Sequence, residues 1–401
     1  MNSIDIIPQN KCFSCRSCEQ ICPASAITFE ENNEGFYYPL INERKCKNCG
    51  LCVKHCPVMS KLHTNQNYNQ KSYVTYLKDK KLLSKSTSGG AFAGFAKTIL
   101  NESGVVFGAA YNDDLTLQQK CAITNNDLES LKGSKYIASD TIDSYQKTKN
   151  LLQNGKKVLY TGTPCQIAGL KSYLYKDYEN LLTIDLICHG VPSQKLFNKY
   201  IKWQEYKNHG SIIYCGFRDK DIGGWLCGKK IKLKVKGKTK VINGAFDPYY
   251  RSFLKCQNYR ESCYTCPYAS ISNRPADITI GDFFEVNLFY KEIDRKHGVS
   301  LVITNTQKGE KYFDFIKDFF ELKTIDCKEY LPVKGNLTAP SPRPKVRDTF
   351  YSEIDNLSPV EFWKAFEETH ISYHLKFYFI KFASKMMPKE IKQLLKKLLR
   401  R

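Results

Sequence analysis

The sequence has 401 residues, enough for about two to three domains with a sizeable core, and its 42% apolar and 25% charged content is ordinary for a soluble globular protein. No apolar stretch is long enough to cross a membrane, and no secretory leader is evident, so we expect a cytoplasmic protein. The net charge is +21, yet residues 1–60 contain equal numbers of acidic and basic side chains, so the excess lies in residues 61–401. A basic surface attracts acidic proteins, anionic cofactors or anionic membranes. We expect no nucleic-acid partner, because no recognition motif for one is present.

Eight of the seventeen cysteines lie within the first sixty residues, in two copies of the pattern C-x2-C-x2-C-x3-C-P. The copies are Cys12, Cys15, Cys18 and Cys22, and then Cys46, Cys49, Cys52 and Cys56. This spacing is that of two-cluster bacterial ferredoxins, in which the fourth cysteine of each run ligates the other run's cluster. We therefore predict two [4Fe-4S] clusters, one on Cys12, Cys15, Cys18 and Cys56 and one on Cys46, Cys49, Cys52 and Cys22. Zinc and disulfides are the alternatives, and eight cysteines this dense with two Cys-Pro endings fit both poorly.

The rest of the chain reads as strands that alternate with helices. Strands at 26–29 and 36–40 predict a hairpin between the two cysteine runs, and the polar residues 61–72 predict a linker. Strands are then expected at 73–77, 105–111, 121–124, 158–161 and 182–187. Helices are expected up to residue 100, with Ser88 as N-cap, and at 127–131, 140–152, 164–173 and 194–206. Strands joined by glycine-bearing loops and helices predict an α/β fold with an at least partly parallel sheet, behind an α+β N-terminal module.

The second half of the chain predicts a β-rich insert, with strands at 212–217, 231–235 and 240–242. We divide the chain into a ferredoxin-type domain (1–60), a linker (61–72), an α/β domain (73–210), a second part carrying a cysteine group (211–335) and an extended segment with a basic helical tail (336–401). In that tail, residues 389–401 form an amphipathic pattern with basic residues opposite the apolar face. This pattern predicts a helix that either contacts an anionic membrane surface peripherally or packs on protein.

Three loops of the α/β part end in residues suited to binding. Ser86, Thr87, Ser88, Gly89 and Gly90 offer hydroxyls and backbone N–H groups before a helix, an arrangement that holds phosphates, although a plain helix start explains it equally well. Two buried strands are followed by a cysteine, Cys165 after Gly162-Thr163-Pro164 and Cys188 before His189 and Gly190. Ligands bind at this edge of parallel sheets. A further pair, Cys263 and Cys266, is too small for a cluster alone, so more ligands must come from Cys165 and Cys188, or from Cys256.

From about residue 73 to 284 the sequence resembles the coenzyme F-420 hydrogenase/dehydrogenase beta-subunit family. The resemblance rests on STSGG (86–90), GSKY (133–136), YTGTPCQIAGL (160–170), CHGVPS (188–193), FRDK (217–220) with Gly224-Trp225, and SCYTCPYA with ADITIGDFF (262–284). It implies FAD in the α/β domain, with Ser134, Lys135 and Tyr136 joining the STSGG loop as binding residues and Gly162, Thr163 and Pro164 near flavin or cluster. It also implies a third [4Fe-4S] cluster on Cys165, Cys188, Cys263 and Cys266.

These expectations combine into one functional hypothesis. Clusters pass single electrons and a flavin exchanges pairs, so we expect an iron–sulfur flavin oxidoreductase that acts on an organic or deazaflavin substrate and meets a ferredoxin or another redox protein. His189 and Asp282 are the candidate proton donors, although hydrogen bonds that fix their loops explain them equally well. The alternatives are a non-catalytic electron-transfer subunit of a larger dehydrogenase and an accessory protein of surface-polysaccharide assembly.

Overall fold

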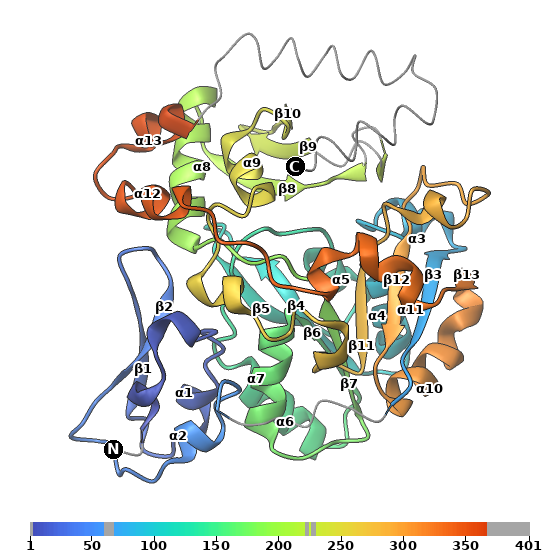
Figure 1. Ribbon diagram of the computed structural model, residues 1–401, viewed down its shortest axis with the longest axis horizontal. Coiled ribbons are helices and arrows are strands. Elements are labelled where there is room, and N and C mark those ends of the chain that lie inside the picture. Colours follow the sequence, from blue (N-terminus) through green and yellow to red (C-terminus); the bar gives the residue numbers. More distant parts are fainter. Residues whose placement is uncertain (1–2, 60–67, 221–223, 226–229, 367–401) are drawn as a thin grey trace.

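The computed structural model describes residues 3–59, 68–220, 224–225 and 230–366 (Figure 1). The strands are β1 (Ile27–Glu31), β2 (Tyr37–Ile41), β3 (Lys71–Leu77), β4 (Val105–Tyr111), β5 (Leu117–Ala122), β6 (Val158–Gly162), β7 (Leu181–Leu186), β8 (Ile212–Phe217), β9 (Lys230–Val235), β10 (Lys238–Asn243), β11 (Ile278–Asp282), β12 (Ser300–Thr304) and β13 (Phe320–Thr324). The helices are α1 (Ser17–Ile21), α2 (Leu51–Lys54), α3 (Lys80–Ser84), α4 (Ala91–Asn101), α5 (Asn125–Leu131), α6 (Ser144–Gln153), α7 (Pro164–Leu174), α8 (Gln194–Asn208), α9 (Pro248–Leu254), α10 (Gln307–Ile316), α11 (Cys327–Tyr330), α12 (Val346–Ser352) and α13 (Pro359–Phe366).

The N-terminal module is a two-stranded antiparallel hairpin, β1 and β2, with the short helices α1 and α2 beside it (Figure 1, blue). Its turn needs a glycine at Gly35, where φ is +87° and an added Cβ would meet the Lys195 side chain of α8 at 2.2 Å. Ile4, Ile27 and the half-buried Phe29 form a small apolar core around the cysteines. The cysteine runs therefore lie on a compact unit that contacts the rest of the chain at specific points.

The body of the protein is built on an eight-stranded mixed sheet with the order β13-β3-β12-β11-β7-β6-β4-β5. Its centre, β11-β7-β6-β4, is parallel, and the outer strands pair antiparallel. The parallel strands have their carboxyl ends at one edge of the sheet, where ligands bind in folds of this kind. This arrangement places the loops after β6, β7 and β11 side by side.

Helices cover both faces of this sheet, and alternate residues of each strand supply the two cores. On β6, Leu159 faces the core that α4, α5 and α10 cover, whereas Val158 and Tyr160 face the core that α6 and α7 cover. All five residues of β6 are buried, as expected for a strand in the middle of a covered parallel sheet. The rigid centre of the molecule thus lies directly beneath the loops that carry the candidate site residues.

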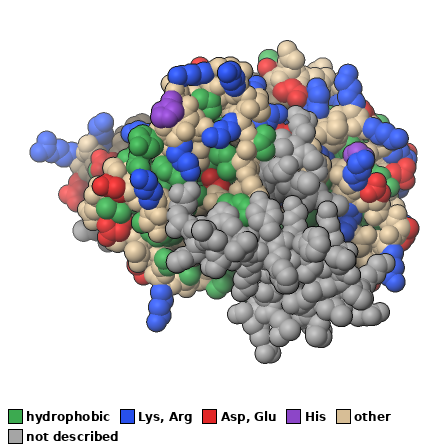
Figure 2. Space-filling view, turned by 90° about the horizontal axis from the view of Figure 1, so that it is seen from above, with side chains coloured by type: hydrophobic (Ala, Val, Ile, Leu, Met, Phe, Trp, Pro, Cys, Tyr) green, Lys and Arg blue, Asp and Glu red, His purple; other side chains and the backbone are tan. Residues whose placement is uncertain are grey.

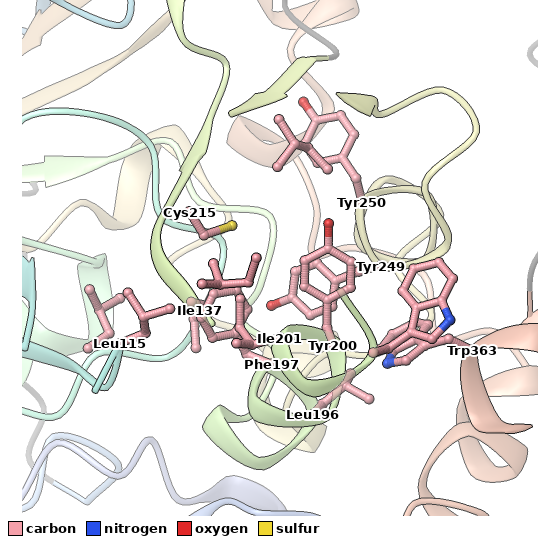
Figure 3. Packing of buried hydrophobic residues seen from close by; sticks show 14 of the residues in the cluster. Leu115, Ile137, Leu196, Phe197, Tyr200, Ile201, Cys215, Tyr249, Tyr250 and Trp363 are labelled. Carbon is pink, nitrogen blue, oxygen red and sulfur yellow. The ribbon is translucent and has the colours of Figure 1, made fainter. Parts of the chain in front are cut away.

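The three-stranded sheet β10-β9-β8 packs with α8, α9, α12 and α13 around a core rich in aromatic rings. Figure 3 shows how Tyr200 of α8, Tyr249 of α9 and Trp363 of α13 converge there. Tyr200 stacks on Tyr249 with ring centroids 4.8 Å apart, and Trp363 meets Tyr200 edge-on at 5.8 Å. Ring pairs in these geometries add about 0.5–1.5 kcal/mol each beyond the burial of their area. This core joins the C-terminal helices to the body.

The α/β prediction is confirmed, and most expected elements lie within a few residues of the observed ones. The strand expected at 121–124 lies instead at Leu117–Ala122, and the helix expected from 140 begins at Ser144. The prediction of Ser88 as an N-cap is wrong: the helix begins at Ala91 after the left-handed Gly90, and the Ser88 hydroxyl donates to the Val299 carbonyl at 2.8 Å. The eight-stranded sheet takes strands from both 73–210 and 211–335, and our division of the chain into domains stays a prediction.

The sequence predicts a basic surface and an amphipathic helix near the C-terminus. On the described part of the face shown in Figure 2, Lys and Arg side chains are spread out with acidic groups between them. The predicted amphipathic helix at 389–401 lies outside the described residues, as does most of the predicted linker. No helix in the part of the chain that the structure describes has the length and apolar character needed to cross a membrane.

Candidate functional site

Each set of four thiols predicted for the N-terminal module lines one pocket. Cys12, Cys15, Cys18 and Cys56 line a cavity of about 330 Å³. A second, smaller pocket is lined by Cys22, Cys46, Cys49 and Cys52. The fourth cysteine of each run therefore faces the pocket of the other run, which is the arrangement that two [4Fe-4S] clusters require. The ligand assignment itself stays a prediction.

The inner of these two thiol sets lies against the body. The Thr141 hydroxyl donates to the Cys15 carbonyl at 2.9 Å, and the Ser262 hydroxyl donates to the Cys12 carbonyl at 3.0 Å. On helix α7, an added Cβ at Gly169 would meet the Cys15 Cβ at 2.7 Å, so the helix backbone touches the cysteine loop. His55 Nδ1 donates to the Ser172 carbonyl of the same helix at 2.6 Å. The first cysteine run is thus fixed on α7 rather than tethered by a linker alone.

A third group of thiols brings together Cys165, Cys188, Cys263 and Cys266 from three separate segments. Burial raises the pKa of Cys188 well above its usual value, and the charges of Cys263, Cys165 and Cys266 raise it further. Burial likewise raises the pKa of Cys263 to about 12, with Cys165 and Cys266 adding to the rise. Cys165 also raises the pKa of Cys12 and of Cys15, although burial is the larger cause for both. The third group therefore lies beside the inner set.

Buried thiols that repel one another as anions suit a metal centre, because coordination supplies the positive charge that deprotonates them. Among the described residues, no three His, Cys, Asp or Glu side chains converge on a site for a single metal ion. The donor set of four thiols fits an iron–sulfur cluster. The charges of Cys263, Cys165 and Cys266 raise the pKa of Cys188, and those of Cys165 and Cys266 raise the pKa of Cys263. Cys256, the alternative ligand, packs with Cys263 against the cluster of Phe253, Tyr259 and Tyr264.

A cavity of about 760 Å³ opens at the carboxyl ends of β6, β7 and β11. This volume is within the range of about 300–1,000 Å³ that is usual for ligand and cofactor sites. Twelve of the predicted site residues line it, and they come from five separate loops: Ser86, Thr87, Ser88, Gly90, Ser134, Lys135, Tyr136, Gly162, Thr163, Cys188, His189 and Asp282. The structure therefore brings together motifs that are scattered over about half of the sequence.

Three residues of the predicted binding loops do not line this cavity. Gly89 lets the loop pack closely against the sheet, because an added Cβ would meet the Thr75 carbonyl oxygen of β3 at 2.3 Å and the Ser300 nitrogen of β12 at 2.5 Å. Pro164 is buried in the first turn of α7. Cys165 lies in the same turn and belongs to the third thiol group. Its Sγ atom is 3.2 Å from the Thr163 hydroxyl.

Lys135 lines the cavity but its ammonium is directed to the backbone. It donates to the carbonyls of Leu131, Lys132 and Gly133 at 3.2, 2.8 and 3.4 Å, at the end of α5. Burial lowers the pKa of Lys135 to about 7. These contacts fix the shape of the loop, so Lys135 positions the cavity wall.

Asp282 is paired with a buried cation. The Arg218 guanidinium donates to both of its carboxylate oxygens, one at 2.9 Å, and the Trp225 indole donates at 3.2 Å. Burial opposes the charged form, but the Arg218 charge and the hydrogen bonds outweigh it and lower the pKa of Asp282. A carboxylate held ionised in this way is a poor proton donor at neutral pH, so the geometry favours the structural alternative for Asp282.

His189 lies in the cavity wall, and its backbone carbonyl accepts from the Ser341 hydroxyl at 2.6 Å. Desolvation and the charge of Lys334 lower its pKa, Asp282 opposes them, and Arg218 adds to the lowering. A neutral imidazole can donate or accept a hydrogen bond to a bound molecule. Of the two candidate proton donors, His189 is therefore the one that keeps a free side chain at the cavity.

Several cavity residues were missed by the sequence reasoning. Tyr250, Phe253 and Leu254 of α9 supply an apolar wall, and Lys334 from near the end of the body donates to the Asp282 carbonyl at 2.7 Å. Arg218 lies in the FRDK segment, so the resemblance offered a signal for it. No motif marked α9 or Lys334.

Comparison with known proteins agrees with this arrangement. Residues 155–328 match the family of coenzyme F420 hydrogenase/dehydrogenase beta subunits, over the carboxyl-terminal part that defines it, and residues 11–60 match the 4Fe-4S dicluster domain. Each match covers less than half of the chain, and the two do not overlap. The resemblance inferred from the sequence is thus confirmed.

Two curated relatives extend over most of the chain. The coenzyme F420-dependent sulfite reductase of Methanocaldococcus jannaschii is 26% identical over 324 residues, which are 80% of this chain and 47% of that protein. The chain thus spans about half the length of that relative. The F-type subunit of the F(420)H(2) dehydrogenase of Methanosarcina mazei is 23% identical over 351 residues, 83% of this chain and 90% of that protein.

Among solved structures, a chain of the F420-reducing [NiFe] hydrogenase complex from Methanosarcina barkeri aligns with a TM-score of 0.44 and 18% identity. The alignment covers 73% of this chain and 89% of that one. A likeness of this degree carries no argument about the site.

Proposed function

We propose that this chain relays single electrons through three iron–sulfur clusters to or from FAD bound in the 760 Å³ cavity, where an electron pair is exchanged with an organic substrate. The observation that carries the proposal is the position of Cys188. This residue lines the cavity and also belongs to the third thiol group. Another member of that group, Cys165, is close enough to Cys12 and Cys15 of the N-terminal module for its charge to raise their pKa values. One continuous series of thiol groups therefore joins the module to the cavity.

The cavity residues fit a flavin dinucleotide in both size and chemistry. Hydroxyl-bearing and glycine residues of the 86–90 loop precede α4, and Gly90, which lines the cavity, has a φ of +82°. Tyr136, Tyr250 and Phe253 also line the cavity and bring aromatic rings to it. A bound flavin would supply the exchange between one-electron and two-electron chemistry. The protein's residues orient that group, exclude water and present the neutral His189 side chain.

The substrate proposal comes from the relatives. Both are named for F420, so a deazaflavin is the first substrate to test. A second candidate function, an electron-input subunit of a larger dehydrogenase, is favoured by the M. mazei relative, which is named as a subunit and is covered over 90% of its length. Neither relative is named for polysaccharide assembly.

Anaerobic purification with iron and flavin counts tests the proposal. With four irons in each cluster, we expect about 12 irons per chain and, after incubation with FAD, about one flavin. Cys263→Ser should lower the iron count to about 8, whereas Cys121→Ser, at an exposed cysteine of β5, should leave it unchanged. If the protein binds no FAD after anaerobic reconstitution, the enzyme proposal is overturned. If the protein turns over only when partner subunits are added, the subunit alternative is favoured.

A further inference from the structure

The charged side chains of the N-terminal module are divided between its two cysteine runs. The part up to residue 39 holds two cations and five acids, which are Lys11, Arg16, Asp5, Glu19, Glu30, Glu31 and Glu34. The part around the second run holds four cations and one acid, which are Arg44, Lys45, Lys47, Lys54 and Glu43. The module is therefore neutral as a whole but strongly polarised, with its positive end at the second run.

The cations of that positive end are exposed and have no carboxylate partner within the described part of the chain. Arg44, Lys45, Lys47 and Lys54 are all exposed. By contrast, Arg16 of the first part is bound to Asp140 of the body, with one hydrogen bond of 2.8 Å, and Glu34 is bound to Arg347 at 2.6 Å. Charges on the inner side of the module thus hold it to the body, whereas Arg44, Lys45 and Lys47 at the second run face solvent. Lys54 is exposed too, with its ammonium 4.6 Å from the centre of the Tyr175 ring of the body.

The exposed cysteine of the module lies between these cations in the sequence, after Arg44, Lys45 and Lys47 and before Lys54. Of the eight cysteines in the two runs, Cys49 alone is exposed, and the other seven are half-buried or buried. Gly50, which follows it with a φ of +72°, turns the chain into α2 and leaves Cys49 at the surface. The pocket of Cys22, Cys46, Cys49 and Cys52 therefore reaches solvent at Cys49, whereas the other pocket adjoins the body.

We propose that the surface formed by Cys49 and the surrounding Arg44, Lys45, Lys47 and Lys54, here called the Cys49 rim, is the docking face for an acidic electron-transfer protein of the ferredoxin type. The inference rests on the proposed function, because it places the outer cluster at this surface. One electron passes from the reduced partner to the cluster on Cys22, Cys46, Cys49 and Cys52, so that the partner is oxidised and the cluster reduced by one electron, and the reverse transfer uses the same face.

The physical reason is electrostatic steering. A positive patch raises the rate of encounter with an acidic partner by about 10- to 1,000-fold, and the gain falls steeply with salt. Redox encounters form small interfaces, below about 1,200 Å², so a small charged surface can serve as a docking face. The rest of the protein is also basic, which makes the position of the charges, rather than their total, the quantity to test.

A matched pair of charge-reversal variants separates these two effects. One carries Arg44→Glu, Lys45→Glu and Lys47→Glu, and the other carries Lys236→Glu, Lys238→Glu and Lys240→Glu on the exposed β9–β10 hairpin. Both lower the net charge by the same amount. Stopped-flow spectroscopy would follow reduction of the clusters by a reduced, acidic plant-type [2Fe-2S] ferredoxin and, separately, by reduced methyl viologen, which is a cation.

We expect reversal of the rim to lower the bimolecular rate constant with ferredoxin at least tenfold at low ionic strength and to leave reduction by viologen as fast or faster. The hairpin variant should change the rate constant with ferredoxin less than threefold. At high salt, the rate constants of the wild type and the two variants should become similar. Equal losses in both variants, or an unchanged rate in the rim variant, would overturn the docking face. Failure of reduced viologen to reduce any cluster in the wild-type protein would instead contradict the proposed function.

Discussion

The guanidinium of Arg260 donates a hydrogen bond to the Ser14 hydroxyl, in the loop between Cys12 and Cys15. Arg260 is 5% exposed, lies over the Phe36 ring at 4.6 Å, and has no carboxylate partner in the described part of the chain. Burial raises the pKa of Cys12, Cys165 and Cys263, and the Arg260 charge opposes that rise at all three thiols. One buried cation therefore favours the thiolate form of cysteines in both the inner thiol set and the third group.

Arg260→Gln should make both of the adjoining clusters harder to reduce. A buried positive charge favours an added electron nearby, and its loss at an effective dielectric constant of about 20 removes about 1–2 kcal/mol, equivalent to roughly 40–90 mV in a one-electron couple. Redox titration followed by electron paramagnetic resonance would measure the shift. Arg343→Gln is the control, since Arg343 is partly exposed and already paired with Glu261 and Asp348. Unchanged potentials with full iron content would refute this role.

Gly169→Ala should loosen the contact between α7 and the first cysteine run. The added Cβ would lie 2.7 Å from the Cys15 Cβ and 2.8 Å from the Tyr145 hydroxyl, so a cost of about 1–3 kcal/mol is expected. The matched control is Gly155→Ala, where the added Cβ meets nothing within 4 Å and only the positive φ of +74° costs free energy. Iron counts after mild heating would compare the two. The idea fails if both variants lose iron equally.

Asp282→Asn should destabilise the cavity, because it leaves the buried Arg218 without its counter-charge. Breaking a buried pair from one side costs about 3–5 kcal/mol, whereas the double replacement Arg218→Met with Asp282→Leu should cost less than either single change. Urea unfolding of the apoprotein would give the four values. Additive effects in this cycle would show that the two residues do not act as a pair.

The same pair predicts a dependence on pH. Since folding lowers the pKa of Asp282, its contribution to stability is complete above the ordinary carboxyl pKa and is lost only as the pH falls through the lower, folded-state value. The stability difference between wild type and Asp282→Asn should therefore be constant through the neutral range and shrink in acid. Unfolding curves of the apoprotein at several pH values would check this.

The cysteine chemistry and the cavity loops could be predicted because their signals are local. Fixed spacings define the two runs, and buried strands such as Val158–Gly162 end in glycine-bearing loops that parallel pairing brings to one edge. The positions of these loops in one cavity follow from the sheet rather than from any single motif.

What could not be predicted depends on contacts between distant segments. The helix after the 86–90 loop begins at Ala91 because Gly89 is pressed against β3 and β12, and no local rule contains that contact. Arg260 precedes a cysteine pair in sequence, but its importance comes from Ser14 and from rings of the hairpin far away along the chain. Tertiary packing of this kind overrides local propensity.

Strand β3 pairs with β12 and β13 only, and all of residues 78–299 separate it from β12. During synthesis, all residues of the cysteine module leave the ribosome early. Strand β3, in contrast, can pair with β12 and β13 only after most of the chain has been made. Contacts between residues so far apart form slowly, because a long loop must close first. The two ends of the proposed electron path therefore form at different times: the ferredoxin-type module can fold on the ribosome, while the cavity is completed only after residue 336 has been made.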